Sequence, residues 1–260
     1  MSTPVTSAGR SSGPTDPDEA APLPRTRLLD RKEVADGTMA FYFEKPPGFE
    51  YRAGQFADYT LLDPAETDSE GDIRGFTLTS APYEPRLMAT TRLRDTAFKR
   101  VLRDLPIGTE LLLDAPHGSF TLHHNVARPA VFLTGGIGIT PVRSIALQAA
   151  HEQTGPAITV FYSNKRPEDA AFLEELHRLA ETEPNFTLVA TMTRPETSRT
   201  AWTGETGHVD QAMLSRHLDD LTAPIYYLSG PATMVRAMRA VLNGAGVDDD
   251  DIRTEEFSGY

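Results

Sequence analysis

Short hydrophobic runs separated by turn residues make up the first half of the chain. Turn signals such as Asp36-Gly37 and Pro46-Pro47-Gly48 lie between the runs. Such runs are typical of short strands, predicted here at residues 26–33, 39–43, 56–61, 75–78, 87–93 and 110–113. A helix is predicted at residues 97–105, where apolar side chains recur at helical spacing. Six strands with one helix predict a small antiparallel β-barrel.

The second half alternates strands with helices. Continuous apolar strands are predicted at residues 130–134, 157–163, 186–191, 225–229 and 252–255. The helices between them are predicted at residues 141–151, 170–182, 210–217 and 231–242. This alternation predicts an α/β domain with a doubly wound parallel sheet that helices cover on both faces.

The change of pattern predicts two domains after a tail. Residues 1–24 are rich in Ser, Thr, Pro, Gly and Asp and hold few apolar side chains, which predicts disorder because little apolar surface can offset the ordering entropy. Residues 25–126 are predicted to form the barrel domain, and residues 127–260 the α/β domain. No apolar run is long enough to span a bilayer, so we expect a cytoplasmic protein.

Composition narrows the classes of function. The net charge is −12, and no long run of Lys and Arg provides the basic face of a nucleic-acid binder. The negative net charge is explained either by solubility or by binding to a basic partner. The chain has no Cys, which excludes disulfides, cysteine catalysis and a thiolate-bound cluster within these 260 residues. His123-His124 has no metal-ligand spacing, so no metal site is predicted.

A glycine-rich turn follows the first strand of the predicted α/β domain. Gly135, Gly136 and Gly138 allow a tight turn, Thr140 is the predicted N-cap, and Pro141 suits the first helical turn. Free N–H groups and the helix dipole there favour a pyrophosphate. Pro141 stands where the usual dinucleotide fingerprint has its third glycine, so a purely structural turn is the alternative.

The next strand ends at a polar and basic segment. Ser163 and Arg166 are predicted to meet the adenosine ribose, because this strand end faces the ribose in doubly wound sheets. A basic position there favours the extra phosphate of NADPH. Because Asp169 is nearby, NADH is also a candidate. The alternative without a ligand is a solvated loop.

Four motifs in order resemble the ferredoxin–NADP reductase family, over residues 25–260. They are Arg74-x-Phe76-Thr77, Gly136-x-Gly138-x-x-Pro141, Ser229-Gly230-Pro231, and the C-terminal segment from Glu255 to Tyr260. The resemblance implies an FAD-binding barrel followed by an NAD(P)-binding domain, without an iron–sulfur domain in these residues. The two domains predicted above have the same order.

The resemblance assigns the flavin site to the first motif. Arg74 would pair with the FAD pyrophosphate. Phe76 occupies the family's tyrosine position and would stack on the flavin without a phenol hydroxyl. Thr77 would place its hydroxyl near flavin N5. An ordinary edge strand is the alternative for these residues, and FMN in place of FAD stays open.

The start of the barrel helix is the second predicted phosphate site. Thr96 is a good N-cap, and the N–H groups of Ala97, Phe98 and Lys99 follow it. In the family this helix start holds the FAD phosphates. A plain cap without a ligand is the alternative.

The resemblance also places Ser229 near the nicotinamide and a carboxylate near flavin N5. Ser229, followed by Gly230 and Pro231, stands where many members have a cysteine, and would donate a hydrogen bond. Glu255 or Glu256 would be the active-site carboxylate, with Glu256 our choice.

The C-terminal aromatic residues would cover the flavin. Plant-type members end on an aromatic ring that stacks over it, and Phe257 or Tyr260 fits that role in this sequence. A frayed terminus is the alternative.

The implied function is an FAD-dependent NAD(P)H oxidoreductase. Hydride would pass from NADPH or NADH to flavin N5, and electrons would then leave to a separate acceptor: a ferredoxin, a flavodoxin, an oxygenase component or a small molecule. The alternative is a non-catalytic flavin-binding subunit of a larger redox complex. A basic cluster of Arg92, Arg94, Lys99, Arg100 and Arg103 is the candidate docking face for a protein acceptor.

Overall fold

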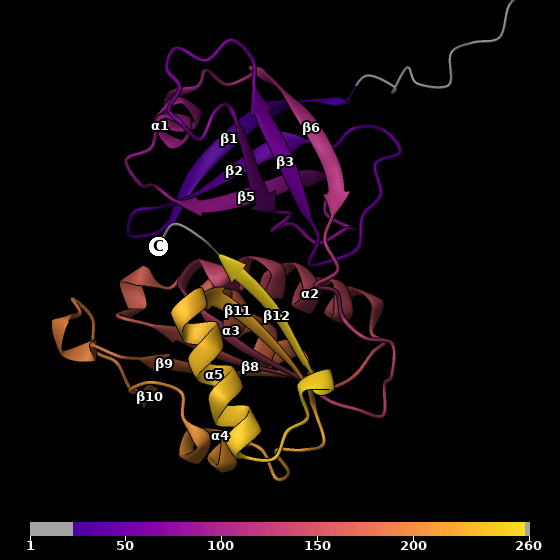
Figure 1. Cartoon of the computed structure of the whole chain (residues 1–260), viewed down its shortest axis with the longest axis vertical. Coiled ribbons are helices and arrows are strands. Elements are labelled where there is room, and N and C mark those ends of the chain that lie inside the picture. Colours follow the sequence, from indigo (N-terminus) through magenta and orange to yellow (C-terminus); the bar gives the residue numbers. More distant parts are fainter. Residues whose placement is uncertain (1–22, 258–260) are drawn as a thin grey trace, which may run out of the picture.

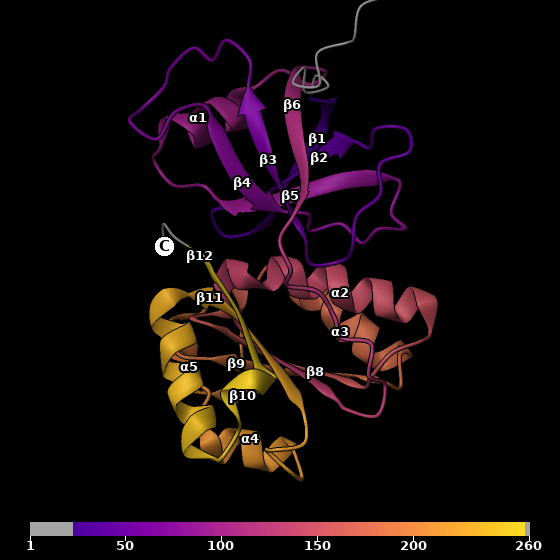
Figure 2. The same cartoon turned by 45° about the vertical axis from the view of Figure 1, so that its right-hand side comes forward.

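The computed structural model describes residues 23–257. These residues form two halves, each built on one β-sheet (Figures 1 and 2). The first sheet lies within residues 25–117 and the second within residues 130–257. Nearly all of the predicted tail, and Tyr260, lie outside the described residues.

The first sheet is antiparallel and closes toward a barrel. Its strands, in the order β4-β3-β6-β1-β2-β5, are β1 (Arg25–Ala35), β2 (Thr38–Glu44), β3 (Phe56–Leu61), β4 (Ile73–Thr77), β5 (Arg86–Arg92) and β6 (Glu110–His117). A bridge between Leu78 and Ala89 links the two outer strands, which leaves fewer free edge groups. Helix α1 (Ala97–Asp104) buries Phe98 and Leu102 in the barrel core. The predicted barrel is confirmed.

The second sheet is parallel, in the order β10-β9-β8-β7-β11-β12. Its strands are β7 (Ala130–Gly135), β8 (Ile158–Asn164), β9 (Phe186–Met192), β10 (Glu205–Thr206), β11 (Ile225–Pro231) and β12 (Ile252–Phe257). Its helices are α2 (Ile139–Glu152), α3 (Leu173–Thr182), α4 (Gln211–His217) and α5 (Ala232–Gly244). One core packs under α2 and α3 and another under α4 and α5, so both faces are covered, as predicted.

Helix α2 lies between the second sheet and the barrel (Figures 1 and 2). Its Arg143 has a side chain only 5% exposed, and it bonds to Glu175 of α3 at 2.7 Å. The same guanidinium donates to the Thr79 carbonyl at 2.9 Å and pairs with Glu84 at 2.9 Å. Ser144 donates to the Ser80 carbonyl at 2.6 Å. A buried cation is stable only when it is well paired, so these contacts fix α2 against the segment that connects β4 to β5.

Candidate functional site

The end of β4 presents an aromatic ring and a buried hydroxyl. Phe76 is half-buried, with ring centroids 6.0 Å from Tyr59 and 5.8 Å from Phe98. Thr77 is 4% exposed, and its Oγ1 has no hydrogen-bond partner within residues 23–257. An unpaired buried hydroxyl is costly, so this atom suits a polar group of a bound ligand. Phe76 and Thr77 therefore fit the edge and face of a flavin ring.

Arg74 is already occupied by its own loop. Its guanidinium pairs with Glu70 at 2.7 Å and Asp68 at 3.4 Å. It also donates to the backbone carbonyls of Glu70 at 2.8 Å and Ile73 at 2.6 Å, and lies 5.4 Å from the ring centre of Phe98. The sequence predicts that Arg74 pairs with the FAD pyrophosphate. In this structure it pairs with the carboxylates of Asp68 and Glu70.

The N-terminus of α1 is capped by a carboxylate from the same loop. Asp68 Oδ2 accepts from Ala97 N at 3.0 Å and Oδ1 accepts from Glu70 N at 2.9 Å. These two bonds hold the pKa of Asp68 below its ordinary value. Thr96 is the N-cap residue, as predicted, but its side chain makes no cap bond within the described residues. Asp68, which sequence reasoning missed, makes the side-chain bond from 29 residues away.

The basic cluster proposed for docking is partly neutralised. Arg100 pairs with Glu66 at 2.7 Å and also with Asp95, and Arg103 pairs with Asp104 at 2.8 Å. Burial first, and then Arg94 and Arg74, lower the pKa of Lys99, which is half-buried in α1.

The glycine turn connects β7 to α2 through a short 3-10 turn, Gly136–Gly138. Gly138 is the N-cap, and α2 begins at Ile139, two residues earlier than predicted. Thr140 is therefore not the N-cap: it lies within the first turn, 1% exposed, and its hydroxyl donates to the Ile137 carbonyl at 3.0 Å. Pro141 is the third helical residue, where it needs no N–H partner.

The glycines are needed because two turns pack together. A Cβ on Gly138 would lie 2.3 Å from the Ser229 carbonyl oxygen, and one on Gly135 would lie 2.4 Å from Met234 Sδ. Gly230 has φ +153°, and it follows Ser229 at the end of β11, before Pro231. Any side chain here would push the β7 turn away from the β11 turn.

Ser229 holds these two turns together. It is fully buried, and its Oγ lies 2.9 Å from the Gly138 carbonyl and 3.1 Å from Thr134 Oγ1. A hydroxyl has one proton, and the Gly138 carbonyl takes it. Ser229 therefore positions the glycine turn, and its hydrogen bond to the nicotinamide stays a prediction.

Glu255, not Glu256, is the buried carboxyl group. Strand β12 alternates, so Glu256 is exposed while Glu255 pairs in register with Ser229. Glu255 Oε2 has no hydrogen-bond partner within residues 23–257, and burial raises the pKa of Glu255 to about 7. The choice of Glu256 is therefore corrected to Glu255. Phe257 is half-buried in register with Pro231.

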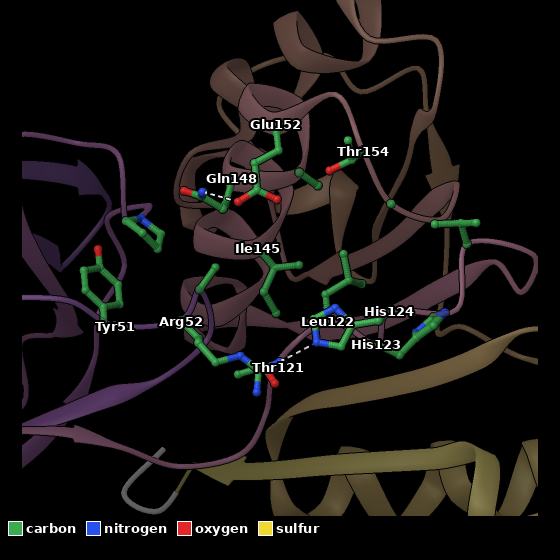
Figure 3. Close-up of a pocket in the computed structure, with 15 residues that line it drawn as sticks. Tyr51, Arg52, Thr121, Leu122, His123, His124, Ile145, Gln148, Glu152 and Thr154 are labelled. Carbon is green, nitrogen blue, oxygen red and sulfur yellow. Dashed lines mark hydrogen bonds between the residues drawn. The ribbon is translucent and has the colours of Figure 1, made fainter.

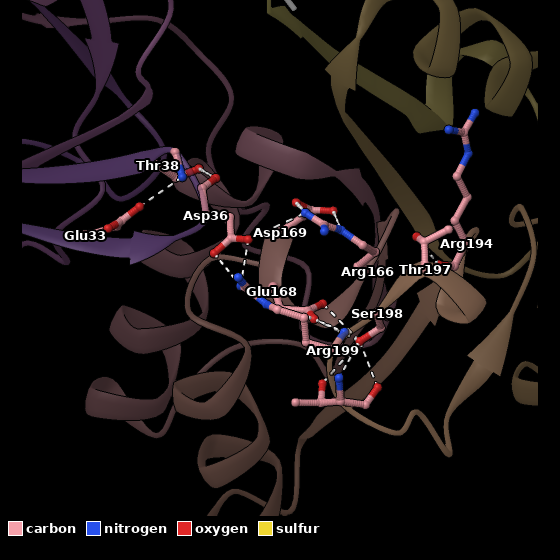
Figure 4. A network of polar contacts seen from close by, with 12 residues as sticks. Glu33, Asp36, Thr38, Arg166, Glu168, Asp169, Arg194, Thr197, Ser198 and Arg199 are labelled. Carbon is pink, nitrogen blue, oxygen red and sulfur yellow. Dashed lines mark hydrogen bonds and ion pairs between the residues drawn. The ribbon is translucent and has the colours of Figure 1, made fainter.

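The ends of β8 and β9 hold a network of polar contacts (Figure 4). Ser163 is half-buried, and Arg166 is bonded to Asp169 at 2.7 and 3.0 Å. The neighbouring Asn164 is 6% exposed, and its amide O and N have no partner within the described residues. Sequence reasoning missed Asn164 and also Arg194, although both lie at the carboxyl ends of parallel strands, where ligands bind.

A cavity of about 350 Å³ lies elsewhere on the interface between the sheets (Figure 3). Arg52, His124, Ile145 and Glu152 are among its lining residues, and Arg52 lies 3.4 Å from His124. The candidate residues described above do not line it. No helix within residues 23–257 has the length and apolar character needed to cross a membrane.

Comparison with known proteins gives a consistent result. The family model "Oxidoreductase NAD-binding domain" matches residues 132–240. The chain is 29% identical over 223 residues to the glycine betaine monooxygenase reductase subunit of Chromohalobacter salexigens, covering 85% of this chain and 60% of that protein. It is 27% identical to the reductase component of propane 2-monooxygenase of Rhodococcus jostii, covering 82% and 57%. The chain thus spans about 60% of the length of such relatives.

Solved structures share the fold. The FAD/NAD-binding domain of a Vibrio cholerae nitric oxide dioxygenase superposes with a TM-score of 0.76 at 20% identity, covering 91% of this chain and 99% of that one. A Neisseria gonorrhoeae ferredoxin NADP+ reductase with bound FAD and NADP gives a TM-score of 0.75 at 21% identity, with the same coverage. Residues 132–240 thus match the oxidoreductase NAD-binding domain, and the chain as a whole shares the fold of FAD- and NAD(P)-binding reductases such as the ferredoxin NADP+ reductase.

Proposed function

We propose that this chain is an NAD(P)H-dependent flavoprotein reductase that passes electrons to a separate acceptor. Bound FAD and NAD(P)H supply the redox chemistry, in which a hydride moves from the nicotinamide to flavin N5. The residues of this chain bind the two groups, orient them and hold a proton between them.

One observation carries the proposal: two buried oxygens that have no hydrogen-bond partner within residues 23–257 flank the N-terminal half of α2. The first oxygen is Thr77 Oγ1. Thr77 is two residues from Thr79 in the chain, and the Thr79 carbonyl accepts a hydrogen bond from Arg143 of α2. Glu255 Oε2 lies in register with Ser229, which binds Gly138 at the start of α2. One oxygen comes from each sheet, as a site shared by two cofactors requires.

Glu255 is suited to hold a proton. A carboxyl group with a pKa of about 7 is protonated on about half of the molecules at neutral pH, so it can donate and accept. Thr77 can hydrogen-bond the flavin edge, and Phe76 can stack on the ring. Gly135, Gly138 and Gly230 let the two turns pack together, and the N–H groups at the start of α2 can then bind the nucleotide phosphates.

The FAD diphosphate fits less well than the flavin ring. Asp68 and Glu70 occupy Arg74 and the N-terminus of α1, the groups proposed to bind it. Diphosphate binding there requires these carboxylates to move aside, which favours a readily dissociable flavin.

The acceptor we propose is an oxygenase component, because relatives over most of this chain are reductase subunits of monooxygenases. With no cysteine in these 260 residues, a thiolate-bound cluster would have to lie outside them. A cytoplasmic location remains a prediction.

Anaerobic titration of the FAD-loaded protein with NADPH and NADH, followed by a panel of acceptors, tests the proposal. Bleaching of the flavin band near one equivalent is expected. Protein that stays colourless with added FAD, or whose flavin is not bleached by either nucleotide, would overturn it. Retained FAD without bleaching would favour the non-catalytic subunit.

A further inference from the structure

The tip of the β1–β2 hairpin in the barrel reaches the nucleotide-binding half of the molecule (Figure 4). Asp36 N, at this tip, donates to the Glu168 carbonyl at 2.8 Å. Glu168 belongs to the 3-10 turn Pro167–Asp169, which follows β8. A barrel residue is thus fixed beside the segment that is predicted to meet the adenosine ribose.

The Asp36 side chain pairs with Arg199. Its two carboxylate oxygens lie 2.9 and 2.8 Å from Arg199 Nη2. The Glu168 carboxylate accepts from Arg199 N and, at 3.0 Å, from Ser198 Oγ. Hydrogen bonds from its own backbone and from Arg199 N hold the pKa of Glu168 below its ordinary value, so it is ionised at neutral pH.

Arg166 is compensated in the same way. Asp169 accepts two of its hydrogen bonds, and Asp36 lies 3.6 Å away on the other side. The Arg166 bonds lower the pKa of Asp169, with Arg166 and Arg92 adding to the effect through their charge. Both arginines at this edge are therefore paired before any nucleotide arrives.

The cluster lies where the adenosine end of a dinucleotide binds in this kind of sheet. Thr193 N donates to the Asn164 carbonyl at 2.9 Å and Arg194 N to the Lys165 carbonyl at 2.8 Å. The segments after β8 and β9 thus run together along the carboxyl edge, where doubly wound folds bind dinucleotides. Arg194 points away from the network and makes no ion pair within the described residues (Figure 4).

We propose that Asp36 is a specificity-determining residue that makes the chain prefer NADH to NADPH, an inference that rests on the proposed function. A 2′-phosphate carries close to two negative charges at neutral pH and needs uncompensated cations. To reach Arg166 or Arg199 it must displace a carboxylate or stay close to Asp36, Glu168 and Asp169, and like charges side by side cost affinity. Arg194, which has no ion pair within the described residues, points away from these groups (Figure 4). NADH avoids this cost because its ribose carries a hydroxyl. The inference reverses the preference that Ser163 and Arg166 suggest from sequence.

Binding of adenosine fragments tests the inference without turnover. Calorimetry should show that Asp36→Asn lowers the Kd of 2′-phospho-AMP by about tenfold and leaves that of 5′-AMP within about twofold. Asp219→Asn changes an exposed carboxylate on the same domain as the nucleotide turn, and it is the matched control for net charge. Equal Kd values for 2′-phospho-AMP in the wild type and Asp36→Asn would overturn the inference.

A double-mutant cycle shows whether Asp36 acts through Arg199. The NADPH-to-NADH ratio of kcat/KM should rise about tenfold in Asp36→Asn, but stay unchanged when the same change is made in an Arg199→Gln background. Asp36→Glu should keep the wild-type ratio. An equal rise in both backgrounds would contradict the mechanism. Wild-type protein that oxidises neither nucleotide would instead overturn the proposed function.

Discussion

The N-termini of α1 and α2 are both predicted phosphate sites, and they are built in opposite ways. At α1 the chain supplies its own anion: Asp68 accepts from Ala97 N, and Glu70 pairs with Arg74. At α2 the first turn has no acidic residue and no side-chain cap, and Gly138 packs against Ser229. The nucleotide side is therefore preformed by backbone, while the flavin side is held by carboxylates that a phosphate must replace.

The largest effect on the N-terminus of α2 is expected from Gly138→Ala. The new Cβ would lie 2.3 Å from a backbone oxygen, so the β11 turn must move, at a cost of about 2–3 kcal/mol in unfolding free energy. Nicotinamide-dependent flavin reduction should fall at least about 100-fold. Gly244→Ala is the control, because a Cβ there meets nothing within 4 Å. Urea unfolding and stopped-flow reduction measure the two effects.

Glu255→Gln tests the proton-holding group between the two sides. The pKa of Glu255 is raised from 4.5 to about 7, so its contribution to stability is full below pH 4.5 and is lost as the pH rises through 7. Each pKa unit corresponds to about 1.4 kcal/mol, so the variant should be more stable than wild type above pH 7 by about 3 kcal/mol.

Reoxidation of the reduced flavin by an acceptor should slow about 100-fold in the same variant, because the proton that reached N5 with the hydride must leave as the electrons do, and a positioned proton acceptor is removed. Glu256→Gln, the exposed neighbour, should change neither quantity. Thermal unfolding from pH 4 to 9 and single-turnover kinetics make the comparison. Identical pH profiles for Glu255→Gln and wild type would show that Glu255 is not the titrating group.

Asp68→Asn tests the flavin side directly. Asparagine can still accept from Ala97 N but loses the charge that competes with phosphate, so the Kd of FAD should fall about fivefold. Asp72→Asn makes the same charge change in the same loop and is the control. Fluorescence titration with FAD is the measurement. Weaker FAD binding in Asp68→Asn would mean that Asp68 helps to build the site.

The smallest effect is expected from Phe76→Tyr. The ring packs between Tyr59 and Phe98, and a phenol can make the same stacking contact. Turnover and the FAD spectrum should stay within about threefold of wild type. A larger loss would show that the ring edge, and not its face, meets the flavin.

Local pattern was enough for the fold and for the location of the motifs. The alternation of strands and helices predicted both sheets, because hydrophobic periodicity is a property of neighbouring residues. Local pattern failed where a contact between residues distant in the sequence determines which side chain performs a role. Thr96 is a good cap by type, but Asp68 reaches the helix first.

The site residues were harder for the same reason. Glu255 and Glu256 are adjacent in sequence, and only the pairing of β12 with β11 decides which one is buried. Arg199 and Asp36 are 163 residues apart, so no local motif contains both. Ser229 fits the family position, but its hydroxyl is used by Gly138.

The buried Arg143 has a consequence for how the protein unfolds. It links α2 to α3 through Glu175 and to the barrel through Thr79 and Glu84. If either half loosened alone, this guanidinium or its carboxylate partners would be left desolvated and unpaired, which is strongly unfavourable. The two cores should therefore melt as one cooperative unit, and a half-folded chain would be a rare species.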